Sequence, residues 1–288
     1  MVITFMNMKG GVGKTTTCIH VASAFALLLK KRVLIIDYDP QFNASQYLMS
    51  AKEYYSLNEK TQTVLAVLSP RAEAATPFKL LLPLPEDPIP SVSTLARSIV
   101  NFKNGGKLHL IPGTLALMYP TLGQPSESLT PMEERFDRFI KNCREQYDHV
   151  FIDCHPAGSF LTKTALLASD HVVLPVAPDS FSKRGIILMH EFLAYLSTFG
   201  KDPKLWIIFN RVPRYDYEPQ IENEIRNDNT FGNKCCKQVI HESRALKTAA
   251  AEHKLVYHIR RPWKWKSGHE LINLGRELHQ RFTGETPK

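Results

Sequence analysis

Eight residues near the start of the chain, KGGVGKTT at positions 9–16, have the composition of a phosphate-binding loop. An apolar run at residues 2–5 predicts a strand before them, and the pattern of residues 15–29 predicts a helix after them. Glycines at such a junction let main-chain N–H groups face phosphate oxygens, and the helix N-terminus adds the positive end of its dipole. This context disfavours a chance glycine-rich turn. We expect a nucleotide to be bound by Gly10, Gly11, Val12, Gly13, Lys14, Thr15 and Thr16.

Lys14 and Thr15 carry the chemistry of this loop. The ammonium of Lys14 can neutralise the β- and γ-phosphates of a nucleoside triphosphate, and the hydroxyl of Thr15 can ligate Mg²⁺. The generic motif has glycine at position 8, where this chain has Met8, and a second lysine, Lys9, follows it. The extra lysine therefore distinguishes this loop from the generic one.

Carboxylates follow two of the predicted buried strands. Asp37 and Asp39 come after the apolar run at residues 33–36, and Asp153 ends the run at residues 150–152. Ligands of open α/β sheets bind at the carboxyl ends of the strands, so Asp37 and Asp39 are candidates for a ligand site. Phosphoryl transfer needs charge neutralisation, a positioned water and a metal bridge. A pair of turn-forming carboxylates at a strand end is the alternative for Asp37 and Asp39.

Strands and helices alternate along most of the chain, which predicts an α/β fold with a mostly parallel sheet and helices on both faces. We expect one domain over residues 1–288, with an insertion at about residues 56–106 and a basic C-terminal region at residues 240–288. The insertion contains the proline-rich stretch LLPLPEDPIPS and is too short for a stable independent fold. Further strands are predicted at residues 108–111, 149–152, 171–176 and 205–209, and further helices at residues 132–146, 160–168 and 182–198.

The run KGGVGKTT resembles the deviant Walker A motif of the ParA/MinD family of P-loop ATPases. DYDPQFN at residues 37–43 resembles the DxDPQxN switch of that family, and VFID at residues 150–153 resembles its Walker B strand. The resemblance implies Mg²⁺-dependent ATP hydrolysis, with Lys9 reaching the ATP of a partner subunit. It also implies that Asp39 orients or activates the attacking water. By the same resemblance, the residues at the phosphates and the metal are Lys14, Thr15, Asp37 and Asp153.

Two further positions are compared with the same family. CHPAG at residues 154–158 resembles its DCPP switch, except that His155 replaces the first proline. We interpret His155 as a tolerated loop substitution rather than a pH-sensitive group. Asn210 ends a predicted strand and resembles the adenine-reading residue of several members, since its amide offers both a donor and an acceptor. An ordinary asparagine at a strand end is the alternative.

The net charge of +8 suits contact with a polyanion. Residues 240–288 contain ten Lys or Arg against five Glu, and HIRRPWKWK at residues 258–266 interleaves aromatic rings with cations. This pattern favours sequence-independent contact with the DNA backbone, although a solvated basic loop with tryptophans packed on the body is the alternative. Glu242 stands where the family often has a DNA-binding arginine. We expect DNA contacts from Arg244, Lys247, Arg260, Arg261, Lys264 and Lys266.

Other classes of protein are disfavoured. The odd set of five cysteines has no CxxC pair, which indicates reduced thiols, and Cys154 alone is a poor match for a cluster-bridging cysteine. A kinase of the family would need a C-terminal tyrosine cluster, but no tyrosine follows Tyr257. The apolar stripe at residues 271–282 is better explained by core packing than by membrane binding. Without a signal peptide or a long apolar stretch, we expect a cytoplasmic protein with no integral membrane association.

The resemblance implies an ATPase that dimerises when it binds ATP and then holds nonspecific DNA on the nucleoid. It would segregate a plasmid or chromosome locus through a ParB-like centromere-binding protein or another cargo adaptor that stimulates hydrolysis. The alternatives are a positioning ATPase for a protein assembly and a membrane-associated cell-division regulator. A nucleotide-gated repressor of its own operon also stays open.

Overall fold

The computed structural model describes residues 1–57, 61–70, 82–84, 86–121, 129–155, 158–215, 217, 219–258 and 264–287. In this part of the chain an eight-stranded sheet has the order β3-β4-β2-β5-β1-β6-β7-β8. Neighbouring strands are parallel except for the antiparallel pair β3 and β4. The predicted α/β class is therefore confirmed. The strands are β1 Val2–Phe5, β2 Arg32–Tyr38, β3 Arg97–Asn101, β4 Lys107–Ile111, β5 His149–Cys154, β6 His171–Val176, β7 Lys204–Val212 and β8 Ile240–His241.

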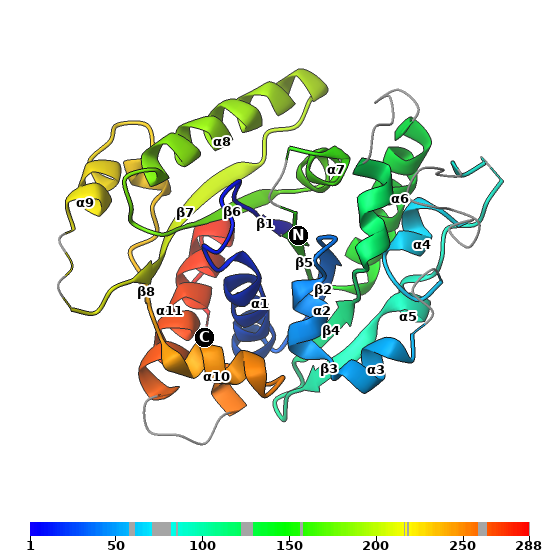
Figure 1. Cartoon of the computed structure of the whole chain (residues 1–288), viewed down its shortest axis with the longest axis horizontal. Helices are drawn as coiled ribbons and strands as arrows, with labels where there is room; N and C mark the ends of the chain where they lie inside the picture. Colours follow the sequence, from blue (N-terminus) through cyan, green and yellow to red (C-terminus); the bar gives the residue numbers. More distant parts are fainter. Residues whose placement is uncertain are drawn as a thin grey trace.

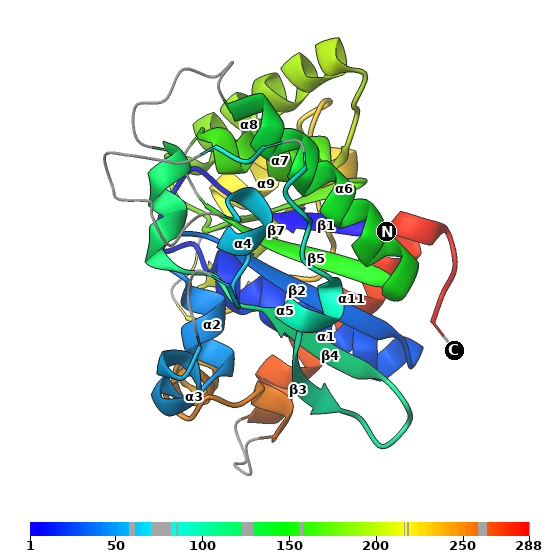
Figure 2. The ribbon, with the colours of Figure 1, turned by 90° about the vertical axis from the view of Figure 1, so that its right-hand side faces the viewer.

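Helices cover both faces of the sheet, with α6, α7 and α8 on one face and α1 and α11 on the other (Figure 2). The α-helices are α1 Lys14–Leu29, α2 Asn43–Leu48, α3 Ala51–Tyr55, α4 Leu65–Leu68, α5 Val92–Leu95, α6 Thr130–Gln146, α7 Phe160–Leu167, α8 Ser182–Leu196, α9 Gln220–Arg226, α10 Arg244–Ala251 and α11 Lys264–Thr283. The 3₁₀ helices are η2 Leu115–Thr121, η4 Ser197–Phe199, η5 Gly232–Lys234 and η6 Val256–His258.

Strand β2 shows why the central strands read as unbroken apolar runs. Leu34 and Ile36 face the core beneath α6 and α7, whereas Val33 and Ile35 face the core beneath α1 and α11. A strand buried on both faces needs apolar side chains at every position, because successive residues point to opposite sides. The sheet is thus a rigid platform whose strand ends position the polar side chains that follow.

The C-terminal helix α11 packs directly on α1, as Figure 1 shows. A Cβ atom added at Gly275 would lie 2.8 Å from the Cβ of Ala24, so a glycine permits this close approach of the two helices. Leu271, Leu274 and Leu278 are fully buried at the contact. The predicted apolar stripe therefore belongs to the hydrophobic core. Its packing on α1 also fixes the helix that follows the phosphate loop.

The described parts of the predicted insertion join the same sheet and the same core. Strand β3 extends the sheet beside β4, and α4 packs on α6. Arg135 of α6 is only 2% exposed and donates three hydrogen bonds to main-chain oxygens of this region. The acceptors are Val67, Asp87 and Pro88, at 2.8, 2.7 and 2.9 Å. One buried guanidinium therefore fastens the insertion to the sheet-covering helix.

The predicted ends of most elements differ from the structure by one to three residues. One difference matters for the site, because β7 continues to Val212 instead of ending at residue 209. The pairing of β7 with β8 shifts between Asn210 and Val212, and Arg211 adopts a left-handed φ of 57° at the bulge. Bulges near the ends of strands redirect side chains. Arg211 is thereby turned towards the loop between β1 and α1, to which it donates a hydrogen bond.

Candidate nucleotide site

The loop at residues 8–13 joins β1, which lies between β5 and β6, to the N-terminus of α1. Gly11 and Gly13 have left-handed φ values of 74° and 84°. A Cβ atom at Gly13 would stand 2.3 Å from Nδ2 of Asn210, so this position requires glycine. The Lys14 side chain is largely buried, and its Nζ donates to the main-chain oxygen of Lys9 at 3.4 Å. The loop and the helix N-terminus together form a positively polarised cradle.

Asn7, which directly precedes this loop, and two side chains of strand β7 brace it. The Oδ1 of Asn7 accepts from the N–H of Lys9 at 2.8 Å, while its Nδ2 donates to the oxygen of Pro175 at 2.7 Å. Asn210 donates to the oxygen of Val12 at 2.7 Å, and Arg211 donates to the oxygen of Gly11 at 2.6 Å. Asn7 and Arg211 are not among the predicted site residues. Each follows a predicted strand by two residues, which was the available signal.

Lys9 lies on the open side of the loop, where it forms an ion pair with Asp179. Its Nζ is also 5.8 Å from the centre of the Phe181 ring. Both residues belong to the loop between β6 and α8, a segment that the sequence analysis did not connect with the site. The Lys9 ammonium beside Asp179 helps to lower the pKa of that carboxyl against the opposing effect of its partial burial. In the single chain, the Lys9 side chain therefore points to the loop between β6 and α8 and not to the phosphate-binding cradle that contains Lys14.

The structure brings Asp37 and Asp153 together beneath the loop. They are register partners on the adjacent strands β2 and β5, and both are buried. The Oδ2 of Asp37 accepts from the N–H of Ser45 at 2.7 Å and from its hydroxyl at 2.6 Å. Among the described residues, Oδ1 of Asp37 and both oxygens of Asp153 have no hydrogen-bond partner. Three buried carboxylate oxygens are thus available to a ligand at this edge of the sheet.

Burial makes ionisation of this acidic pair costly. Burial, reinforced by the charge of Asp153, raises the pKa of Asp37 well above its usual range. The pKa of Asp153 is also raised, to about 7, and burial is the largest cause. The Asp39 carboxylate adds to this increase, whereas the Thr15 hydroxyl and the Lys14 ammonium oppose it. Two like charges in a desolvated position repel each other unless a cation lies between them. The electrostatics therefore favour either a proton or a metal ion here.

The donor set of this acidic pair fits Mg²⁺. Within the described residues, no group of three or more His, Cys, Asp or Glu side chains gathers as a metal cluster. Mg²⁺ does not need one, because it commonly takes one or two carboxylates and completes its shell with water and substrate phosphates. Asp37 and Asp153 supply unpartnered carboxylate oxygens, and Thr15 contributes a hydroxyl beside Asp153. These three residues would hold the ion.

Gly113 fixes Asp37 from the far side, and the sequence analysis did not identify it. Its N–H donates to the hydroxyl of Ser45 at 2.9 Å, and its oxygen accepts from Tyr54 at 3.0 Å. A Cβ atom at Gly113 would lie 2.7 Å from the main-chain oxygen of Asp37. The Pro112-Gly113 pair directly after a predicted strand was the local signal for such a close approach.

Asp39 lies at the same edge and is 5% exposed. Its Oδ1 accepts from the N–H of Gln41 at 2.9 Å, and its main-chain oxygen accepts from the N–H of Phe42 at 2.8 Å. The Phe42 ring stacks on Tyr54 with the ring centres 5.0 Å apart. The segment after β2 is therefore a fixed turn that places the Asp39 carboxylate beside the acidic pair. The negative charge of Asp39 acts to raise the pKa of Asp153.

A cavity of about 590 Å³ opens beside the loop, a volume that suits a small ligand. It is bounded by the loop, by the end of β7 and by α10. Arg244 and Lys247, predicted to contact DNA, line this cavity on the exposed side of α10. Glu242, also at its rim, pairs with Arg211 at 3.4 Å. The cavity residues from the loop, the start of α1, the end of β7 and the segment after β7 are Gly11, Gly13, Thr16, Thr17, Asn210, Arg211, Arg214 and Tyr215.

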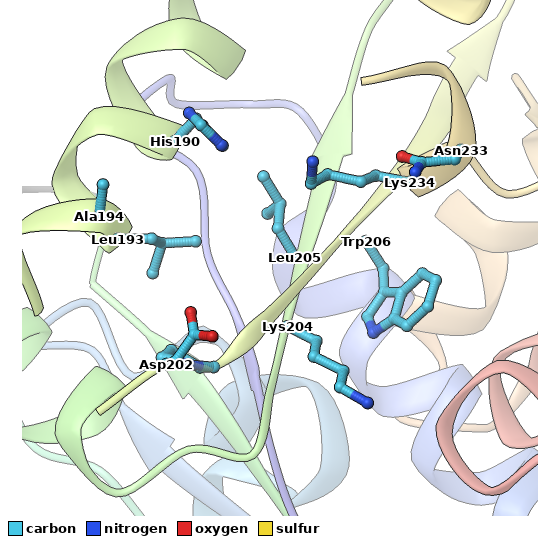
Figure 3. Close-up of a pocket in the computed structure, with 10 residues that line it drawn as sticks. His190, Leu193, Ala194, Asp202, Lys204, Leu205, Trp206, Asn233 and Lys234 are labelled. Atoms are coloured by element: carbon cyan, nitrogen blue, oxygen red, sulfur yellow. The ribbon is translucent and has the colours of Figure 1, made fainter. Parts of the chain in front are cut away.

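Of the other predicted DNA-binding residues, only Lys266 has a described side chain, and it is not among the residues that line this cavity. Arg260 and Arg261 lie outside the described residues, as does the side chain of Lys264, while Lys266 is exposed in the first turn of α11. A separate cavity of about 370 Å³ lies between α8 and the start of β7, lined by residues such as His190, Lys204 and Trp206 (Figure 3). It adjoins the opposite end of β7 from Asn210 and is separate from the loop.

A strand, a phosphate loop and a helix, with two buried carboxylates on adjacent strands beneath the loop, define a P-loop nucleotide-binding protein. The model of a family described as an AAA domain matches residues 1–205. Together with the relatives below, this match shows that the chain belongs to the P-loop ATPases of the ParA/MinD type, as the motifs predicted.

Two sequence relatives illustrate the family. The sporulation initiation inhibitor protein Soj of Bacillus subtilis is 32% identical over 185 residues, which cover 64% of this chain. The chain spans 61% of the length of that relative. The chromosome-partitioning ATPase Soj of Treponema pallidum is 25% identical over 240 residues, covering 83% of this chain and 81% of that protein.

Solved structures share the fold. A variant of McdA from Cyanothece in complex with ATP has a TM-score of 0.71 at 17% identity and covers 96% of each chain. Cobyrinic acid a,c-diamide synthase from Mycobacterium smegmatis with ADP and magnesium has a TM-score of 0.66 at 19% identity. The match covers 99% of this chain and 97% of the synthase. Neighbours with this fold thus bind nucleotide, and one holds magnesium.

Proposed function

We propose that this chain hydrolyses ATP at the loop between β1 and α1. The buried pair Asp37 and Asp153, with three unpartnered oxygens beneath that loop, carries the proposal, because such a pair suits a metal ion beside bound phosphates. Lys14 neutralises phosphate charge from the helix N-terminus, and Asp39 orients or activates the attacking water. Asn210 and the neighbouring cavity receive the nucleoside.

Thr15, Asp37 and Asp153 would hold Mg²⁺. When bound, the ion neutralises charge that develops on the phosphate oxygens. Ser45 and Gly113 fix the position of the Asp37 carboxylate. Asn7 and Arg211 hold the loop in the conformation that admits the phosphates. Positioning of this kind accounts for most of the catalysis of phosphoryl transfer.

We further infer that ATP joins two copies of the chain face to face and that the dimer holds nonspecific DNA. Lys9 lies on the open side of the loop, where its ammonium can reach a partner's phosphates once it leaves Asp179. Dimerisation would double the number of phosphate contacts, so a weak monomer becomes a useful DNA-binding dimer. The name of the Treponema pallidum relative, a chromosome-partitioning ATPase, supports segregation of DNA cargo.

In this proposal the protein acts in the cytoplasm on the nucleoid, and a ParB-like adaptor bound to the cargo stimulates hydrolysis and dissolves the dimer. In the described part of the chain, no helix has both the length and the apolar composition to cross a bilayer. The net charge of +8 favours a polyanionic partner.

Binding to random-sequence duplex DNA tests the function most directly. The purified protein is measured with ATP, ADP or no nucleotide, each at two salt concentrations. We expect binding only with ATP, and we expect it to weaken steeply as salt rises, because counterions return to the DNA. Binding that ignores the nucleotide, or no binding at all, would favour a positioner on a membrane or protein scaffold instead.

A further inference from the structure

The hairpin between β3 and β4 is fixed against the end of α1 that lies farthest from the phosphate loop. Asn104 donates to the main-chain oxygen of Leu27 at 2.6 Å, and the N–H of Phe102 donates to the oxygen of Gly106 at 2.8 Å. A Cβ atom at Gly106 would lie 2.0 Å from the oxygen of Ala26, so the hairpin touches the helix main chain. The turn is therefore rigid, and the side chains on it are held in place.

This hairpin and the adjoining helix end carry unneutralised positive charge. Lys103 and Lys107 on the hairpin and Lys30 after α1 are all exposed, and none forms a salt bridge with another described residue. Lys31 is also exposed and pairs with Asp148 at 3.3 Å. Residues 97–111 contain no Asp or Glu. Lys30, Lys103 and Lys107 thus form a basic corner of the surface, to which the insertion contributes Lys103.

The basic corner adjoins the C-terminal segment that the sequence predicts to contact DNA. The ring of Phe102 lies 6.2 Å from the ring of His258, the residue at which the run HIRRPWKWK begins. Figure 1 shows the hairpin and α10 along the same lower edge of the molecule, and Figure 2 shows the hairpin on that edge from a second direction. The hairpin therefore lies beside the residue at which this basic run begins.

We propose that Lys103 and Lys107 of the β3–β4 hairpin, together with Lys30, bind backbone phosphates of duplex DNA. The proposal rests on the proposed function and deepens it, because it gives the insertion a role in DNA binding. Rigid, spaced ammonium groups suit phosphates, and phosphate contacts give affinity without reading sequence. An anionic membrane fits less well, since no large apolar side chain between residues 97 and 111 is exposed for insertion into lipid.

The double variant Lys103→Gln/Lys107→Gln tests this surface in the full-length protein. Its matched control is Lys201→Gln/Lys237→Gln, which removes the same charge from exposed lysines of the segments before β7 and before β8. Affinity for random-sequence duplex DNA is measured with ATP over a series of salt concentrations. Loss of two phosphate contacts should reduce the slope of log K against log salt by about 1.8 per subunit. The control variant should keep the wild-type slope.

The outcomes separate the two proposals. If the wild-type protein binds DNA with ATP and both double variants show its slope, the hairpin has no role in DNA binding and the proposed function stands. If the wild-type protein binds no DNA with any nucleotide, the proposed function fails first. ATP hydrolysis and the thermal unfolding midpoint should match the wild type in both variants. Flotation with phosphatidylserine vesicles is run in parallel, and hairpin-dependent vesicle binding without DNA binding would overturn the choice of DNA.

Discussion

Asp37 and Asp153 are the residues whose environment departs furthest from that of ordinary carboxylates. They face each other across adjacent strands, out of contact with water, and only one of their four oxygens has a hydrogen-bond partner in the part of the chain that the structure describes. An apolar replacement would be easier to bury, so the arrangement costs stability in the absence of a ligand. Sites that bind metal ions and phosphates commonly carry such a cost. The protonation state of the pair and its ligand are therefore linked.

The variant Asp153→Asn tests this linkage. The pKa of Asp153 is about 7 in the folded chain and lies above its unfolded value. A group with this sign stabilises the fold when protonated, and the contribution is lost as the pH rises from about 4 through about 7. Without Mg²⁺, the variant should therefore be more stable than the wild type at about pH 8, by about 1–4 kcal/mol, and equally stable at low pH. Urea unfolding at several pH values measures the difference.

Mg²⁺ should act in the opposite direction to the proton. Because the ion needs ionised carboxylates, millimolar MgCl₂ with ADP should raise the unfolding temperature of the wild type more at about pH 8 than at about pH 6. Asp153→Asn should lose most of this shift. An equal shift at both pH values, or an undiminished shift in the variant, would place the ion elsewhere.

Asp179 holds Lys9 in the single chain, and the proposed dimer requires Lys9 to leave it. Exposed ion pairs contribute roughly 0.2–1 kcal/mol, and each dimer would break two of them, so Asp179→Asn should tighten dimerisation with a non-hydrolysable ATP analogue by at most about thirtyfold. As a control, Asp202→Asn removes a similar exposed charge before β7 and should leave the dimer dissociation constant unchanged. Sedimentation equilibrium provides both constants. Weaker association of Asp179→Asn would mean that Asp179 serves the interface itself.

At the scale of elements, Arg135 joins α6 to the insertion. Replacement by methionine keeps much of the volume but leaves three main-chain oxygens without their donor. A loss of about 3 kcal/mol in unfolding free energy is expected, since buried acceptors are costly to leave unsatisfied. The neighbouring Arg138 is exposed, and Arg138→Met should change stability by less than about 0.5 kcal/mol. Urea unfolding compares the two, and equal losses would show that Arg135 contributes no special anchoring.

The sequence predicts best the parts of the site that local patterns define. The loop residues with Lys14, and the carboxylates Asp37 and Asp153, lie where a strand ends, so apolar periodicity locates them without tertiary information. The ion pair of Lys9 with Asp179 and the hydrogen bond of Arg211 to the loop join residues about 170 and 200 positions apart. No local pattern specifies which loops meet at one edge of a sheet.

Strands β3 and β8 show the same limit for the fold. Strand β8 has only two residues, and β3 is an edge strand whose partly exposed residues give no continuous apolar run. Their pairing depends on neighbours that are already folded rather than on intrinsic preference. Edge strands of this kind are added by tertiary contacts, and the central strands buried on both faces are the ones that the sequence identifies.

At the scale of the whole molecule, the sheet separates two surfaces with different proposed tasks. The carboxyl ends of β1, β2 and β5 present the phosphate loop and the acidic pair, while the basic corner lies at the other end of α1. A helix of 16 residues spans roughly 24 Å, so the basic corner lies too far from the phosphate loop for direct contact with the nucleotide. In our proposal, assembly of the dimer couples the two.

Two variants of the nucleotide site test that coupling. Lys14→Ala removes the charge that holds the β- and γ-phosphates and should abolish ATP-dependent dimerisation, which light scattering after size exclusion detects. Asp39→Ala should dimerise with ATP but fail to dissociate, because it lacks only the group that orients water. DNA binding should follow the dimer, lost in the first variant and persistent in the second. Equal loss of the dimer in both would contradict the assignment of Asp39, since a residue needed only for hydrolysis leaves assembly intact.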